Sequence, residues 1–155
     1  MNYRISGLDP AAFAHLVNLP DYRLAAQGVI RMAAEAYPGS PCRITLDDAR
    51  TGEMLLLVNH CSHDAPTAYR ASHAIFVSEA ALTAAIFVNE IPPALDRRIL
   101  SLRGFDNAGM MCDDALVHPG EADPAIRKMF ADRAVDHIDA HNATRGCFAA
   151  RIERG

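Results

Sequence analysis

The sequence predicts an α+β fold: a mainly antiparallel, curled sheet with two N-terminal helices and one late helix. Strand-like segments follow one another in the middle of the chain instead of alternating with helices, which disfavours a parallel sheet. Helix-start signals occur at Asp9-Pro10, Pro20-Asp21 and Asp123-Pro124. The 155 residues are 50% hydrophobic and contain no linker-like stretch. We therefore expect a single domain spanning residues 1–155.

The N-terminal part is predicted to contain a short strand, two helices and a second strand. Tyr3 to Ile5 forms the first strand. Asp9-Pro10 supplies an N-cap carboxylate and a proline for the first turn of the first helix. The second helix begins at Pro20-Asp21 and ends near Gly28. Val29 to Ala36 fits both helical and strand periodicity, and we favour a strand.

The central part is predicted to consist of strands. Cys42 to Leu46 alternates apolar and polar residues, which is typical of a half-buried strand. Met54 to Val58 is apolar throughout, which is typical of a strand buried on both faces. Two similar heptads follow, Ala74 to Ala80 and Ala85 to Ile91, and we interpret them as adjacent strands. Asp47-Asp48 is interpreted as a solvated turn.

The C-terminal part is predicted to contain two hairpins and a helix. In the first hairpin, Asp106 to Gly109 supplies the turn between two strands. The late helix begins at Asp123-Pro124, and a second turn, Asn142 to Gly146, joins the last two strands. The four strands are predicted at Arg98 to Phe105, Met110 to Val117, Val135 to Ala140 and Cys147 to Ile152.

Composition excludes several classes of protein. The net charge is -4, and the single lysine, Lys128, belongs to no basic block, so we expect no nucleic-acid partner. The chain shows no signal peptide and no apolar run of membrane-spanning length, so we expect a cytoplasmic protein with no membrane partner. Its four cysteines form no C-x-x-C pair and are expected to be reduced.

Several motifs in combination resemble an uncharacterised bacterial family, the domain-of-unknown-function family 1203. The motifs are Ser6 to Pro10, Gly39 to Arg43 with Asp48-Ala49 and Gly52-Glu53, Tyr69-Arg70 with Ile75 to Val77, and His141-Asn142 with Gly146-Cys147. The resemblance spans almost the whole chain and implies one domain, but no activity. The chain departs from the family in having Ala68 in place of a proline and His73-Ala74 in place of a Gly-Pro pair.

The segment from His141 to Cys147 is the strongest candidate for chemistry. A nucleophilic thiol needs a nearby cation or imidazole and a base oriented by a third group. We therefore consider Cys147 as a nucleophile, His141 as its base and Asn142 as the group that orients the ring. The alternative is a buried, inert cysteine beside a structural turn.

The histidines suggest a metal site, although we assign no metal and no cofactor. His137, Asp139 and His141 share one face of a predicted strand. The two outer residues lie about 13 Å apart on a straight strand, so the three side chains do not reach one ion. An ion bound by Asp139 and one of the two histidines would need further ligands. These would come from His60, His63 or His73.

Arginine side chains suggest an anion site. Arg43, Tyr69, Arg70 and Arg103 offer planar guanidinium groups and a hydroxyl to a carboxylate or phosphate. Two functions therefore stay open. The first is a non-catalytic module that binds a small anionic ligand or a protein partner, and the second is a thiol-dependent enzyme. Exposed strand edges also suggest a homodimer.

Overall fold

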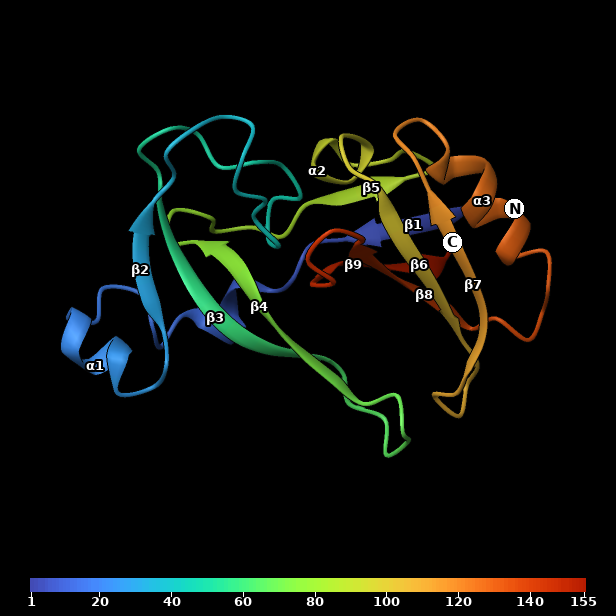
Figure 1. The fold of residues 1–155 in the computed structure, drawn as a ribbon, viewed down its shortest axis with the longest axis horizontal. Helices are drawn as coiled ribbons and strands as arrows, with labels where there is room; N and C mark the ends of the chain where they lie inside the picture. Colours follow the sequence, from blue (N-terminus) through green and yellow to red (C-terminus); the bar gives the residue numbers. More distant parts are fainter.

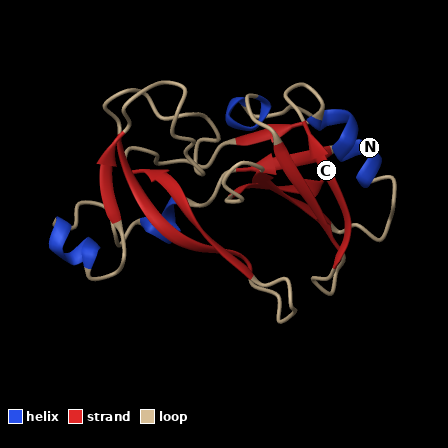
Figure 2. Cartoon of the chain, viewed as in Figure 1, coloured by secondary structure: helices blue, strands red, loops and turns tan.

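A computed structural model describes residues 1–155 and contains two antiparallel sheets (Figures 1 and 2). The six-stranded sheet has the order β5-β1-β9-β8-β6-β7, and the three-stranded sheet has the order β2-β3-β4. The strands are β1 (Tyr3–Ser6), β2 (Ile30–Ala33), β3 (Met54–His63), β4 (Ala71–Ser78), β5 (Ile86–Val88), β6 (Leu100–Phe105), β7 (Met111–Val117), β8 (His137–Asn142) and β9 (Phe148–Arg154). The mixed, mainly antiparallel fold is confirmed. The single curled sheet is not found.

The helices are short, and two of them lie at opposite ends of the molecule (Figure 1). They are η1 (Pro10–Phe13), α1 (Asp21–Ala25), α2 (Pro93–Asp96) and α3 (Ala122–Met129). Of the two helices predicted near the N-terminus, only α1 is an α-helix. The other, η1, is a 3-10 turn capped by Asp9. Sequence analysis predicted no helix at α2, which begins at the second of two consecutive prolines, Pro92 and Pro93. No helix has the length and apolar character needed to span a membrane.

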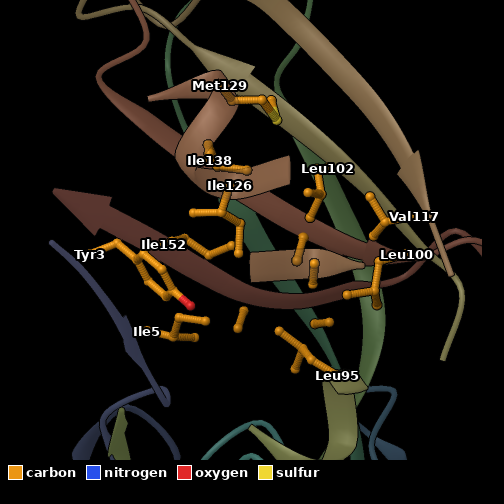
Figure 3. Packing of buried hydrophobic residues seen from close by; sticks show 14 of the residues in the cluster. Tyr3, Ile5, Leu95, Leu100, Leu102, Val117, Ile126, Met129, Ile138 and Ile152 are labelled. Atoms are coloured by element: carbon orange, nitrogen blue, oxygen red, sulfur yellow. The ribbon is translucent and has the colours of Figure 1, made fainter. Parts of the chain in front are cut away.

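Each sheet has its own apolar core. In the six-stranded sheet, α3 packs Ile126 and Met129 against Leu102 and Ile138 (Figure 3). The three-stranded sheet has a smaller core, in which Phe13 of η1 and Leu24 of α1 cover strand residues. The strand residues of that second core are Leu56, Val58, Ile75 and Val77.

Two local predictions about strands are wrong. The two heptads do not form adjacent strands, because β4 pairs with β3 while β5 pairs with β1 at the edge of the other sheet. The segment from Cys42 to Leu46 is a turn, in which the Leu46 amide donates to the Cys42 carbonyl at 3.0 Å. Only Cys42 keeps a strand-like contact, a bridge to Phe76. Local alternation does not specify which distant strand supplies the backbone partners.

The sheets meet across a polar surface between β3–β4 and β8–β9, which we call the seam. Side chains from both sheets meet there as aromatic pairs, namely His60 with Phe148, His63 with His137, and His73 with His141. The other two histidines, His15 and His118, are exposed. Histidine is thus concentrated where the two units touch.

We predict that the two sheets form one domain and unfold together. Because polar contacts tie the sheets together across the seam, calorimetry should show one transition, with the calorimetric enthalpy equal to the van't Hoff enthalpy. Two resolved transitions would show that each sheet with its own core unfolds independently.

The same experiment tests the predicted homodimer. β2, β5 and β7 end their sheets, and Ile30, Ile86 and Leu116 on them expose 54%, 63% and 65% of their surface. Pairing or covering these edges would bury them. A homodimer predicts a transition midpoint that rises with protein concentration, whereas a monomer has a constant midpoint.

Candidate functional site

A cleft of about 780 Å³ opens at one end of the seam. The segment 39–43, β4, the residues after α2 and the β8–β9 turn surround it, and Figure 1 shows that turn lying between the two sheets. Polar lining residues are Ser40, Arg43, His73, Arg97, Arg98, Asn142, Thr144, Arg145 and Cys147. The apolar lining includes Leu57, Phe76 and Ile99.

Arg43 is the buried cation of this cleft. It is only 3% exposed, and its guanidinium donates to the carbonyls of Phe148 and Pro41 at 2.8 and 2.6 Å. A third donor atom, Nη2, lies 3.1 Å from Cys147 Sγ. Burial lowers the pKa of Arg43, and the Cys147 sulfur partly offsets that effect. No carboxylate pairs with Arg43, although its charge is buried.

Gly7 allows the segment that carries Arg43 to approach β1 closely. The Leu8 amide donates to the Arg43 carbonyl at 2.8 Å, which fixes the backbone at this position. A Cβ atom on Gly7 would lie 1.9 Å from the Ile44 carbonyl oxygen. Only glycine fits there, so the motif near the N-terminus positions Arg43 without touching the cleft itself.

Cys147 and Asn142 lie together in the β8–β9 turn. The Asn142 side-chain amide donates to Cys147 Sγ at 3.5 Å, and its backbone amide donates to the Cys147 carbonyl at 2.9 Å. Gly146 has a φ of 76° and closes the turn. Cys147 is partly buried and lines the cleft, so its sulfur is placed between Asn142 and Arg43.

His141 does not hydrogen bond to the Cys147 thiol. The strand register pairs His141 with Phe148, and the His141 Nδ1 atom lies 2.9 Å from the Gly146 carbonyl oxygen. Burial lowers the pKa of His141 to about 4, despite the opposing effect of that hydrogen bond. The ring is therefore neutral at neutral pH. The imidazole that lines the cleft is His73, whose ring packs against His141.

The outer wall of the cleft is an ion-paired cluster. Asp48 is fully buried and pairs with both Arg97 and Arg98, while Asp47 pairs with Arg97 at 2.8 Å. Burial alone would raise the pKa of Asp48, but the arginine hydrogen bonds outweigh it and hold that pKa below its usual value. The interpretation of Asp47-Asp48 as a solvated turn is therefore wrong.

The cleft carries an excess of positive charge. Four arginines line it and no acidic residue does. The two aspartates behind the wall balance Arg97 and Arg98, which leaves Arg43 and Arg145 without an acidic partner. Sequence analysis missed Arg97 and Arg98. The available signal was a pair of complementary doublets, Asp47-Asp48 and Arg97-Arg98.

The other residues predicted to bind an anion do not join Arg43. Tyr69 packs on Phe105, at the opposite end of β6 from the cleft, and Arg70 pairs with Asp64 at 2.7 Å beside it. Arg103 lies on β6 and donates to Ser101 Oγ at 3.4 Å. A separate cluster of possible metal ligands, His63, His137 and Asp139, lies elsewhere in the seam.

We predict that Asp48 makes folding sensitive to acid. The pKa of Asp48 is lower in the folded protein than in the unfolded chain, where it is about 3.9. The stabilisation from Asp48 is therefore complete at pH values above the unfolded pKa and is lost as the pH falls through the folded pKa. Asp48→Asn should lower the free energy of unfolding at pH 7 by about 2 kcal/mol, because it removes the buried carboxylate that accepts from the partly exposed Arg97 and Arg98.

Urea titrations from pH 2.5 to pH 7 would measure this effect, with Asp64→Asn as the control. Asp64 also pairs with an arginine, but both side chains are exposed, so its removal should cost less than about 1 kcal/mol. Equal losses in the two variants, or an unchanged acid dependence in Asp48→Asn, would contradict the assignment.

Comparisons with known proteins place the chain in a family. The family model described as a protein of unknown function (DUF1203) matches residues 39–154. No curated protein and no solved structure matches the chain. The matched range contains all the residues that line the cleft, from Gly39 to Cys147. The chain belongs to the DUF1203 family of proteins of unknown function.

Proposed function

We propose that the cleft binds a small metabolite carrying a carboxylate or phosphate group. The observation that carries this proposal is the buried guanidinium of Arg43, which has no carboxylate partner. A buried charge is costly unless an opposite charge or a full set of hydrogen bonds compensates it. An anionic ligand in the cleft would supply that charge.

The other lining groups support an anionic ligand of small-molecule size. Arg145 is exposed and has no ion-pair partner, so its guanidinium is available to form two parallel hydrogen bonds with a carboxylate or phosphate. The Ser40 and Thr144 hydroxyls also line the cleft. Leu57, Phe76 and Ile99 would contact the carbon skeleton of the ligand. A volume of about 780 Å³ is typical of small-molecule sites.

The contacts of Cys147 favour a second candidate function, thiol chemistry in the same cleft. The sulfur accepts from Arg43 and Asn142, and a cationic neighbour favours a reactive thiolate. Such a thiolate would attack the carbonyl carbon of an acyl substrate, forming a thioester as the leaving group departs. His141 was predicted as the base. His73 is the imidazole that lines the cleft.

Isothermal titration with phosphate, citrate and a panel of small dicarboxylates would test anion binding. Arg145→Gln should weaken the binding of an anion about tenfold, because it removes one of the two unbalanced charges. The matched control is Arg23→Gln, since Arg23 is exposed on α1 and does not line the cleft. Failure of every anion to bind at about 10 mM, or equal weakening by both variants, would contradict the proposal.

Alkylation by iodoacetamide, followed residue by residue with mass spectrometry, would test the thiol candidate. We expect the Cys147 sulfur to react faster than that of Cys61, although Cys61 is more exposed, because only Cys147 contacts a guanidinium. A bound anion should slow the reaction at Cys147 and leave Cys61 unchanged. Alkylation of Cys147 only after unfolding would eliminate thiol chemistry and leave the binding function standing.

A further inference from the structure

The second polar cluster of the seam lies at the end opposite the cleft. His63 ends β3, His137 begins β8, and Asp139 lies two residues further along β8 on the same face. These side chains offer ligand atoms that all lie within 4.8 Å of one another. The cluster thus joins the two sheets, and none of its members lines the cleft described above.

The hydrogen bonds of His137 leave one ring nitrogen free to bind a metal. Nδ1 lies 3.0 Å from a carboxylate oxygen of Asp136, which can only accept, so Nδ1 carries the proton. Nε2 is then the nitrogen with a lone pair. It is buried and has no hydrogen-bond partner. A histidine held by a carboxylate in this way is typical of metal ligands.

The ring of His63 is held by the tip of the β6–β7 hairpin. Its Nε2 lies 2.9 Å from the Gly109 carbonyl oxygen and must donate to it, which leaves the lone pair on Nδ1. The ring also stacks on Phe105 with a centroid distance of 4.0 Å. Phe105 stacks on His137 as well, so one aromatic side chain orients both imidazoles.

Asp139 supplies the negative charge. Its side chain is fully buried, and its two carboxylate oxygens accept from Arg151 at 2.8 and 2.9 Å. Each oxygen has a second lone pair, so this ion pair leaves Asp139 able to bind a cation. Asp136 and Asp139 together carry -2 against the +1 of Arg151, and the cluster therefore has a net negative charge.

We propose that His63, His137 and Asp139 bind one divalent transition-metal ion of the Zn²⁺ class, which joins the two sheets. Two imidazoles and a carboxylate suit zinc better than magnesium or calcium. Tetrahedral ligands at about 2.1 Å lie about 3.4 Å apart, so the cluster closes on an ion through side-chain movements of about 1 Å. A water molecule would supply the fourth ligand.

The experiment titrates chelator-treated protein with ZnCl2 in a calorimeter and repeats the titration with MgCl2. We expect one Zn²⁺ per chain, no measurable Mg²⁺ binding and a melting temperature that rises with Zn²⁺. His137→Gln should weaken Zn²⁺ at least a hundredfold, and Asp136→Asn should weaken it 10- to 100-fold by freeing the ring. His118→Gln, at an exposed histidine outside the seam, should change nothing.

Two results would overturn the proposal. One is the absence of stoichiometric Zn²⁺ binding to the unsubstituted protein. The other is Zn²⁺ affinity that is unchanged in Asp136→Asn, a substitution at an exposed side chain that leaves the cluster itself intact. The second result decides the question even where His137→Gln does not fold. Because the two sites share no residue, neither outcome depends on anion binding in the cleft.

Discussion

Charged hydrogen bonds from two buried or half-buried arginines hold the two sheets together. Arg43, from the unit containing the three-stranded sheet, donates to the Phe148 carbonyl of β9 at 2.8 Å. Arg151, on β9, donates in the opposite direction to the Ser62 carbonyl of β3 at 2.9 Å. Each sheet has its own apolar core, so the geometry of the seam depends on these polar contacts.

The two arginines differ in how their charge is balanced. Arg151 faces the fully buried carboxylate of Asp139 and forms a complete ion pair within the protein. Arg43 has carbonyl oxygens and a cysteine sulfur as its partners, and no acidic residue lines the cleft beside it. Buried charges are normally paired. An anion from outside the chain would therefore be stabilised beside Arg43, at that end of the seam.

Sequence reasoning succeeded where the relevant contacts are local. The turn from Asn142 to Gly146 joins β8 and β9 as predicted, although it brings Asn142 against Cys147 and not His141. The alternation along β8 also placed Asp139 and its neighbouring histidines on the face away from Ile138. Both predictions depend only on residues close together in the sequence, through a tight turn or through the alternation of side chains along one strand.

Sequence reasoning failed where a contact joins distant segments. Arg43 and Cys147 are 104 positions apart, and no local pattern in either segment indicates the other. The same limit explains the wrong pairing of the two heptads, since an identical alternation suits an edge strand in either sheet. The pairing of Asp48 with Arg98 likewise depends on how α2 packs against the segment before β3.

The most direct test of this account follows the Arg43 side chain itself by NMR. Its Nε–H donates to a buried carbonyl, so the resonance should be protected from exchange and identifiable by its loss in Arg43→Lys. During titration with an anion that binds, the account predicts a saturable shift of this resonance together with those of Asn142 and Cys147. A shift confined to exposed arginines, with the Arg43 signal unchanged, would contradict it.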